Sequence, residues 1–338
     1  MIEVRSLWKV FGTRSEAALT LARTGADRSE VLSKTGCTIG VRDVSFDVAQ
    51  GETFVVMGLS GSGKSTLIRC LSGLHDITSG EVRLGGRSLV GISPDDLRDL
   101  RRTKMAMVFQ HFGLFPHRRV IDNIAYGLEV QGVGKVERRR RAGEVLELVG
   151  LSGWDQHYPD QLSGGMQQRV GLARALALDP EILFFDEPFS ALDPLIRRDM
   201  QDELIRLQRE LRRTIVFITH DFAEAIRLGD RIAVMKDGVF EQIGAPEDVV
   251  ASPATPYVEA FTRDVPQSKV VRARTIMVAA LRSGGARSIG PDDTVEQLIP
   301  LLLLDHEPLV VRDLKGVAIG SVGIEQVRLV LTATSAPS

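Results

Sequence analysis

The chain has 338 residues, which suggests about two domains, and its 43% hydrophobic and 25% charged residues are typical of a globular protein with a buried core. Lysine and arginine total 42 against 44 aspartates and glutamates, so the chain lacks the excess positive charge of a nucleic-acid-binding protein, and we expect no nucleic acid partner. Cys37 and Cys70 show neither a disulfide framework nor the spacing of a zinc site. There is no apolar run of roughly 18 residues and no signal-peptide core, so we do not expect the chain by itself to cross a membrane.

The first expected elements are a strand at Ile2–Phe11, which alternates weakly like an edge strand, and a polar insert over residues 12–40. The insert carries two short helical patterns, and Asp27 and Glu30 open the second with the spacing of a capping box. Phe54–Met57 is apolar throughout, as expected for a strand covered on both faces of a parallel sheet. The next helix is expected to bury one apolar face, made of Leu67, Cys70, Leu71 and Leu74.

A glycine-rich loop between this strand and this helix matches the pattern GxxxxGK[ST] of a phosphate-binding P-loop. Glycines allow successive backbone N–H groups to face a phosphate, and the N-terminus of the following helix adds its positive dipole end. Lys64 would supply a charge to the outer phosphates, and Ser65 an oxygen to Mg²⁺. We therefore expect a nucleoside triphosphate to be bound by Gly58, Leu59, Ser60, Gly61, Ser62, Gly63, Lys64, Ser65 and Thr66.

Two further buried strands are predicted, Ile182–Phe185 and Thr214–Ile218, with a helix between them that Asp193 caps. Alternating strands and helices indicate a parallel α/β domain, in which ligands bind at the carboxyl edge of the sheet. The first strand ends in Asp186 and Glu187. Acidic residues after a strand are often only solvated turn residues, but the P-loop earlier in the chain favours a catalytic role. Asp186 would hold Mg²⁺, and Glu187 would polarise the attacking water.

His220 follows the second of these strands, and its role depends on a family resemblance. The segment Leu162–Arg169, with the sequence LSGGMQQR, resembles the signature of the ATP-binding-cassette (ABC) family and precedes Asp186 at that family's spacing. Gln110 resembles the family's Q-loop glutamine, Ser190–Asp193 its D-loop and His220 its switch histidine.

The resemblance implies an α/β fold: a P-loop ABC ATPase domain over residues 1–264, with a mixed sheet and a helical subdomain at about residues 111–170. It also implies ATP and Mg²⁺ as cofactors, with Gln110 sensing Mg²⁺ and water, Glu187 acting as the base and His220 holding the γ-phosphate. Because the chain has one P-loop and one signature, the family pattern implies a head-to-tail dimer with two composite sites. The further nucleotide contacts implied are Phe11, in the place of the adenine-stacking aromatic, together with Ser163 and Gly165 from the second copy, Gly164 and Asp193.

Within the family, the chain resembles the ATPase subunits of importers for quaternary amines such as glycine betaine, proline betaine and choline. The insert before Val41, the block Val56–Gly63 and the segment Phe115–Arg118 carry that resemblance. It implies a membrane permease and an extracytoplasmic solute-binding protein as partners, and a peripheral location on the cytoplasmic face of the bacterial inner membrane.

Three alternatives are weighed against this interpretation. An importer for another polar solute, such as an amino acid, is the nearest. A soluble ABC ATPase that acts on nucleic acid or ribosomes usually has two cassettes or a long coiled-coil insert, and neither is present in this sequence. A nucleotide-binding regulator without hydrolysis is disfavoured by Glu187 and His220.

After a hairpin turn at Lys236–Gly238, the chain is expected to leave the ATPase domain near Asp264. Residues 265–338 resemble a linker followed by a single cystathionine-β-synthase (CBS) motif, a small α+β domain. Gly323–Gln326 replaces the nucleotide-contacting Ser/Thr-x-x-Asp of that motif, and Pro300 interrupts its first helix, so adenosine is not expected there. One motif per chain implies pairing between two chains, either for regulation or for dimerisation alone.

Overall fold

The computed structural model describes residues 1–110, 113–263, 265–279, 287–305, 307–313 and 315–333. The chain divides into two compact units, Met1–Phe240 and Glu241–Ser338. This division comes earlier than the boundary expected near Asp264, a residue that lies outside the described part. Helix α11 (Pro246–Ala251) belongs with the second unit, because its buried Glu247 pairs with Arg274 of α13 (Ala273–Ile276) at 3.1 Å. Helix α12 (Pro256–Thr262) also lies before the expected boundary and within the second unit.

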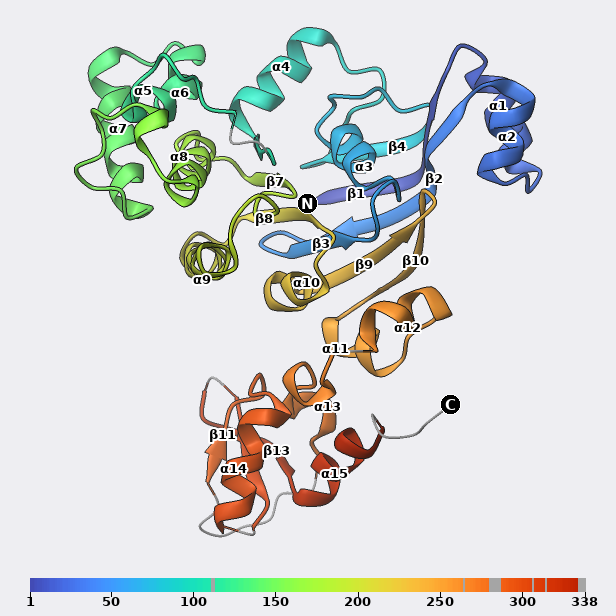
Figure 1. Ribbon diagram of the computed structural model, residues 1–338, viewed down its shortest axis with the longest axis vertical. Helices are drawn as coiled ribbons and strands as arrows, with labels where there is room; N and C mark the ends of the chain where they lie inside the picture. The colour runs from blue at the N-terminus through green and yellow to red at the C-terminus, as the bar shows by residue number, and fades with distance from the viewer. Residues whose placement is uncertain (111–112, 264, 280–286, 306, 314, 334–338) are drawn as a thin grey trace. The chain divides into compact units, whose positions relative to one another are not determined.

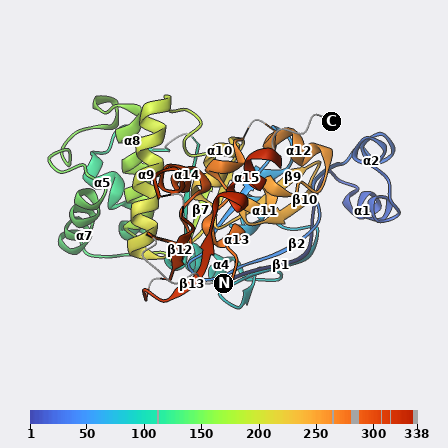
Figure 2. The ribbon, with the colours of Figure 1, turned by 90° about the horizontal axis from the view of Figure 1, so that it is seen from below.

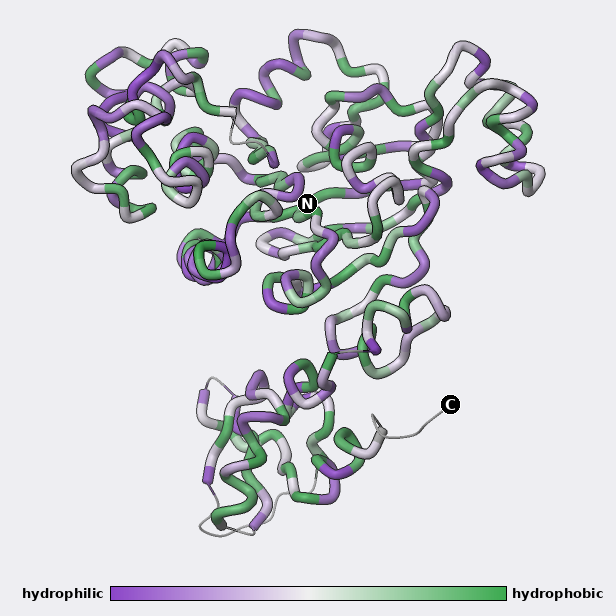
Figure 3. The backbone as a smooth tube through the Cα atoms, in the orientation of Figure 1, coloured by the Kyte–Doolittle hydropathy of each residue, from purple (hydrophilic) through white to green (hydrophobic). Residues whose placement is uncertain are grey.

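A six-stranded sheet in the order β10-β9-β3-β8-β7-β6 lies in the first unit, except that its edge strand β10 continues past Phe240 (Figure 1). Its strands are β3 Thr53–Met57, β6 Met105–Val108, β7 Ile182–Asp186, β8 Thr214–Thr219, β9 Arg231–Lys236 and β10 Val239–Gly244. As predicted, β3, β8 and β7 are buried along their whole length and pair in parallel in that order. Figure 3 shows hydrophobic residues along these strands. Strand β6 was not predicted, because four residues between charged segments carry no recognisable strand periodicity.

A second sheet, with antiparallel strands, has the order β2-β1-β4-β5. Its strands are β1 Ile2–Phe11, β2 Thr38–Val48, β4 Ser79–Leu84 and β5 Arg87–Ser88. The edge position expected for Ile2–Phe11 is wrong, because β1 lies inside this sheet and pairs with both β2 and β4. Alternation along a strand reflects which of its faces are buried, and it does not report whether its edges are hydrogen-bonded.

The insert after β1 folds into two short helices, α1 (Ser15–Arg23) and α2 (Arg28–Thr35), as predicted. Figures 1 and 2 place both helices on the side of the first unit away from α7 (Lys135–Leu148). Asp27 accepts a hydrogen bond from the backbone N–H of Glu30 at 2.8 Å, which confirms the predicted N-cap. Buried apolar residues of the insert and of strands β1 and β2 form one cluster: Trp8, Val10, Ala18, Ala22, Ala26, Val31, Cys37 and Ile39.

The other helices of the first unit are α3 Lys64–Leu71, α4 Pro94–Thr103, α5 Val120–Ile124, α6 Tyr126–Val130, the 3-10 turn η1 Pro159–Gln161, α8 Gly164–Leu176, α9 Pro194–Leu211 and α10 Phe222–Leu228. Helices α5 to α8 form the helical part that was expected at about residues 111–170, with α8 continuing beyond it. Helix α3 ends earlier than expected, because the chain turns at Gly73 with φ +69°. Leu74 therefore lies outside the helix and is 47% exposed.

The second unit also contains η2 Gln267–Lys269, β11 Ser288–Ile289, α14 Val295–Asp305, β12 Leu309–Arg312, β13 Ala318–Val322 and α15 Ile324–Ala333. Its three strands form a sheet in the order β11-β12-β13. Pro300 lies inside α14, where the sequence placed it. Among the described residues of the chain, no helix is both long and apolar enough to span a bilayer.

Candidate nucleotide site

The glycine-rich loop connects β3 to α3 at the carboxyl edge of the six-stranded sheet. Gly63, the N-cap of α3, has φ +112°, and a Cβ built on it would lie 2.3 Å from the carbonyl oxygen of Gly40. A Cβ on Gly58, with φ +153°, would lie 2.2 Å from the carbonyl oxygen of Met235. Backbone with positive φ in such close contact accepts only glycine, so the loop conformation explains these two residues of the motif.

Lys64 is buried directly under this loop, with only 4% of its surface exposed. Its Nζ donates hydrogen bonds to the carbonyl oxygens of Gly58 at 2.8 Å and Leu59 at 3.0 Å. The same Nζ lies 3.7 Å from Oε1 of Glu187. Burial lowers the pKa of Lys64, and the nearby carboxylate of Glu187 opposes that shift.

Ser65 and Asp186 bring two oxygen groups together beside Lys64. The hydroxyl of Ser65 donates a hydrogen bond to Oδ1 of Asp186 at 2.9 Å. Asp186 ends the buried strand β7, and burial raises the pKa of its carboxyl group. A divalent cation fits this pair, because Mg²⁺ takes one or two oxygen ligands from the protein and would offset the cost of the buried carboxylate.

Glu187 and His220 follow neighbouring parallel strands and meet at the same edge. Nδ1 of His220 lies 2.9 Å from Oε2 of Glu187. Glu187 has φ +48°, unusual for a residue other than glycine, and its N–H donates to the carbonyl oxygen of Ile218 at 3.1 Å. This turn separates the directions of two consecutive carboxylates, so Asp186 contacts Ser65 while Glu187 contacts Lys64 and His220. We call Lys64, Ser65, Asp186, Glu187 and His220 the P-loop half of the site.

The signature residues lie at the start of α8, and their surroundings differ. Ser163 is the N-cap of α8, and its hydroxyl accepts a hydrogen bond from the N–H of Met166 at 3.4 Å. Gly165 is buried, and a Cβ on it would lie 2.4 Å from Cγ2 of Ile196 in α9. Asp193 caps α9 through the N–H of Ile196 at 3.1 Å.

The signature segment and Asp193 therefore lie close together through this packing of α8 on α9. We call Ser163, Gly164, Gly165 and Asp193 the signature half of the site. Ser163 and Gly164 are exposed. Within the described part of the chain, no hydrogen bond or ion pair joins the signature half to the P-loop half.

Gln110 and Phe11 complete the set of residues predicted from the sequence. Gln110 is exposed and comes two residues after β6, next to the strand β7 that delivers Asp186. Phe11 ends β1 and is 38% exposed. A Cβ added to Gly40 would lie 2.8 Å from both Phe11 and Thr66, so the Phe11 ring lies beside the first turn of α3. The remaining predicted loop residues are Leu59, Ser60 and Gly61, which are exposed, and Ser62, which is buried.

One residue beside the loop was missed by sequence reasoning. Arg28, the first residue of α2 in the insert, donates through Nη1 to the carbonyl oxygen of Gly61 at 3.2 Å. The same nitrogen lies 3.3 Å from Oδ1 of Asp237. No local pattern marks this arginine, because its partners are 33 and 209 residues away along the chain.

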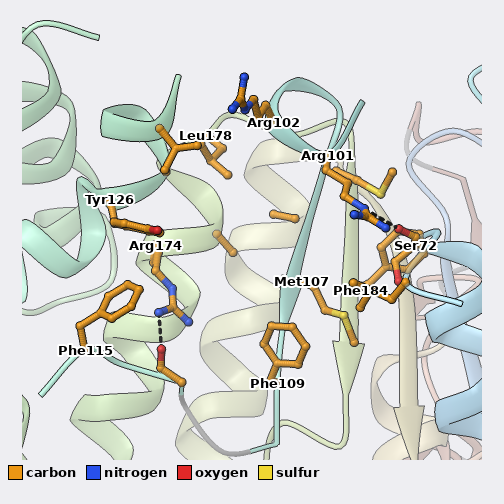
Figure 4. Close-up of a pocket in the computed structure, with 17 residues that line it drawn as sticks. Ser72, Arg101, Arg102, Met107, Phe109, Phe115, Tyr126, Arg174, Leu178 and Phe184 are labelled. Carbon is orange, nitrogen blue, oxygen red and sulfur yellow. Dashed lines mark hydrogen bonds between the residues drawn. The ribbon is translucent and has the colours of Figure 1, made fainter. Parts of the chain in front are cut away.

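An apolar cavity of about 420 Å³ lies between the six-stranded sheet and the helical part of the first unit (Figure 4). Its wall includes Met107 and Phe109 from the segment just before Gln110, and Phe115 and Tyr126 from the helical side. Arg174 of α8 donates a hydrogen bond to the carbonyl oxygen of Gly113 at 2.6 Å within it. Burial lowers the pKa of Arg174.

Comparison with known proteins identifies the family. The ABC transporter family model matches residues 41–190. The trimethylamine N-oxide transport system ATP-binding protein TmoW of Ruegeria pomeroyi is 51% identical over 321 residues, covering 95% of this chain and 94% of that protein. This chain belongs to the ABC transporter family. The family membership inferred from the motifs is therefore confirmed.

Other relatives of this ABC protein act in related transport systems. The glycine betaine transport protein OpuAA of Bacillus subtilis is 54% identical, over 82% of this chain and 67% of that one. The glycine betaine/proline betaine protein ProV of Escherichia coli is 50% identical, over 81% and 69%. Among solved structures, the dimeric ATP-binding cassette MJ0796 bound to ADP and Pi is 32% identical with a TM-score of 0.61, covering 73% of this chain and 99% of that one. The P-loop ABC ATPase fold is confirmed.

Proposed function

We propose that this chain hydrolyses ATP, as one half of a head-to-tail dimer, to drive import of a small N-methylated solute through a membrane permease. The observation that carries the proposal is the connected set of side chains in the P-loop half. It unites a buried lysine, a hydroxyl and carboxylate pair, and a carboxylate next to a histidine at the end of three neighbouring parallel strands. These are the groups that triphosphate hydrolysis needs.

Each group has a distinct role in this proposal. Two backbone carbonyls of the loop bind the ammonium group of Lys64, which would turn to the outer phosphates of ATP. Ser65, Asp186 and Gln110 would hold Mg²⁺, which when bound neutralises charge on the phosphates. Glu187 would accept a proton from the attacking water, and His220, hydrogen-bonded to it, would hold the γ-phosphate. Phe11 would stack on adenine beside Thr66.

The second half of each site would come from a second copy of the chain. The signature half is exposed at Ser163 and Gly164 and, within the described residues, has no hydrogen bond or ion pair to the P-loop half, which supports completion across a two-fold dimer. The solved relative MJ0796 is described as dimeric.

The cavity of Figure 4 supports a docking site for the permease on the cytoplasmic side of the membrane. Its wall is largely apolar, and Phe109 within it directly precedes Gln110. An element of the permease inserted there would press on the strand end that carries Gln110, which would couple solute transport to hydrolysis. The solute itself would be captured outside the membrane by a binding protein, so no residue of this chain need contact it.

Two solutes are favoured by the comparisons. Glycine betaine is supported by OpuAA and ProV, whose names carry it. Trimethylamine N-oxide is supported by the extent of the match, since TmoW of R. pomeroyi and of Pelagibacter ubique each align over 95% of this chain, against 82% for OpuAA. Both solutes carry a methylated nitrogen. The permease and the binding protein would therefore have to distinguish them by the size and charge of the groups around that nitrogen.

The C-terminal unit is proposed to pair with its copy in the second chain. Leu303, Leu304 and Leu329 are 59%, 67% and 66% exposed on α14 and α15, which pack on each other in this unit. A CBS-like motif present once per chain would cover such a surface by pairing.

Transport assays test the whole proposal. The chain is reconstituted in vesicles with its permease and binding protein, and ATP-dependent uptake of radiolabelled glycine betaine, trimethylamine N-oxide and a neutral amino acid is compared. Uptake of a methylated amine that is lost in K64A supports the proposal. Uptake of the amino acid alone would favour the alternative importer, and absence of ATP hydrolysis would refute the enzymatic function.

A further inference from the structure

A guanidinium group of the insert between β1 and β2 reaches the P-loop. Arg28 donates to the carbonyl oxygen of Gly61 at the tip of the loop and pairs with Asp237 in the β9–β10 hairpin turn. Its Nε donates to the carbonyl oxygen of Ile39 at 2.8 Å, at the start of β2. One side chain thus links the insert, strand β2, the P-loop and the hairpin.

Arg28 is itself held in position by the packing of the insert. The preceding residue, Asp27, caps α2, and Val31 of the same helix lies in the apolar cluster shared with β1 and β2. Arg42 of β2 donates to the carbonyl oxygens of Ala22 and Ala26 and so fastens the insert to β2. The guanidinium that contacts the P-loop is therefore carried by a well-packed helix.

Arg28 contacts the loop at Gly61, a point that few other groups approach. Gly61 is exposed, has φ +80°, and a Cβ on it would meet nothing within 4 Å. The next carbonyl, that of Ser62, accepts a hydrogen bond at 2.8 Å from the N–H of Gly238 in the hairpin. Two successive carbonyls of the loop are thus bonded to groups outside it. Because a trans peptide places C=O and N–H on opposite sides, these bonds also fix the directions of the neighbouring amides.

We propose that Arg28 is a positioning residue of the nucleotide site, which fixes the P-loop main chain from the insert so that its amides are ordered before ATP arrives. This inference rests on the proposed function, since it assigns a role within the same site. Preorganisation lowers the entropy that binding must remove, so it should act on nucleotide affinity and leave the chemical step unchanged. Arg28 bonds to protein groups, and the catalytic groups of the P-loop half are not among them.

The test compares R28A and R28K with R14A in the full-length chain. Arg14 is a matched control, because it also lies in the insert and donates to backbone carbonyls, those of Thr35 and Lys34, without touching the P-loop. We measure Kd for a fluorescent ATP analogue, KM and kcat for hydrolysis, and Tm. R28A should raise Kd and KM about tenfold at nearly unchanged kcat, the order expected for one charge-assisted hydrogen bond, and R28K should recover part of the loss.

R14A should lower Tm about as much as R28A but leave Kd unchanged. An unchanged Kd in R28A, or an equal rise in R14A, would overturn the inference while leaving the proposed function intact. Failure of the wild-type chain to bind the analogue would overturn the proposed function instead. Should R28A fold poorly, R28M provides a second variant: it keeps an unbranched apolar side chain but removes the donors to Gly61, and a normal Kd in R28M would contradict the proposal.

Discussion

The two halves of the nucleotide site differ in how far one chain assembles them. The P-loop half is connected by hydrogen bonds and ion pairs, because three parallel strands deliver its members to one sheet edge. The signature half is held in shape by the packing of α8 on α9, and its first residues face solvent. Under the proposed composite site, the difference means that a single chain is preorganised for binding nucleotide and needs a second copy for hydrolysis.

The largest effect is expected from E187Q, which tests the P-loop half alone. The amide keeps the shape of the side chain but cannot accept a proton from water, so turnover should fall by roughly 10²- to 10⁴-fold while ATP binding persists. Hydrolysis and ATP binding are measured on the same preparation. E181Q is the control, since Glu181 lies on the surface and pairs with Lys104. Turnover of E187Q close to that of the wild type would show that Glu187 is not the base.

Mixing inactive variants tests whether the two halves come from different chains. K64A lacks a working P-loop half, and S163R lacks a working signature half. Random pairing makes half of the dimers mixed, and each mixed dimer has one intact site of two, so up to about a quarter of wild-type activity should return. Mixing K64A with E187Q should restore nothing, because both lesions lie in the P-loop half. Equal activity in the two mixtures would contradict a composite site.

The pH dependence of stability sharpens the description of the P-loop half. Burial raises the pKa of Asp186, so the folded chain disfavours the ionised carboxylate at neutral pH. D186N should therefore raise the Tm of the nucleotide-free chain at pH 7 while abolishing hydrolysis. The gain should vanish below about pH 4, where Asp186 is protonated in both the folded and the unfolded chain. A thermal scan of both proteins from pH 3.5 to 8 would check this, and a pH-independent difference in Tm would refute it.

The smallest effect on hydrolysis is expected from removing the C-terminal unit, which contributes to neither half. A chain ending at Gly244 keeps strand β10 and removes α11 together with its partner Arg274, and it should bind and hydrolyse ATP as the full chain does. Uptake in vesicles at several internal ionic strengths then separates the two roles left open for this unit. Identical salt profiles for the two chains would leave only dimerisation, whereas a profile lost on truncation would indicate a regulatory role.

The P-loop half could be predicted because its parts depend on local sequence. A glycine loop follows one apolar strand, and two carboxylates follow another. Once the sheet is known to be parallel, both groups are expected at its carboxyl edge. The contact between Ser65 and Asp186 follows from that topology. The backbone bonds of Lys64 do not follow from it, because they depend on how the loop closes.

Features that depend on distant pairing could not be predicted. The inner position of β1 is fixed by β4, far along the chain, and alternation in β1 carries no information about it. The boundary between the units at Phe240 is marked by no change in composition, and the ion pair of Glu247 with Arg274 that links α11 to the second unit joins residues 27 positions apart. No sequence pattern marked Arg28 for the same reason. Its three hydrogen-bond partners come together only when the chain folds.

The backbone of Glu187 has a consequence for laboratory evolution. Its φ of +48° is a conformation that costs an ordinary L-residue about 1 kcal/mol and glycine almost nothing. Glycine or asparagine at position 187 would relieve this strain, but it would also remove the carboxylate that faces Lys64 and His220 and that the proposed mechanism uses as the base. A selection for heat resistance should therefore screen for turnover in every round, because under the proposed mechanism a substitution that relaxes this backbone also removes the base.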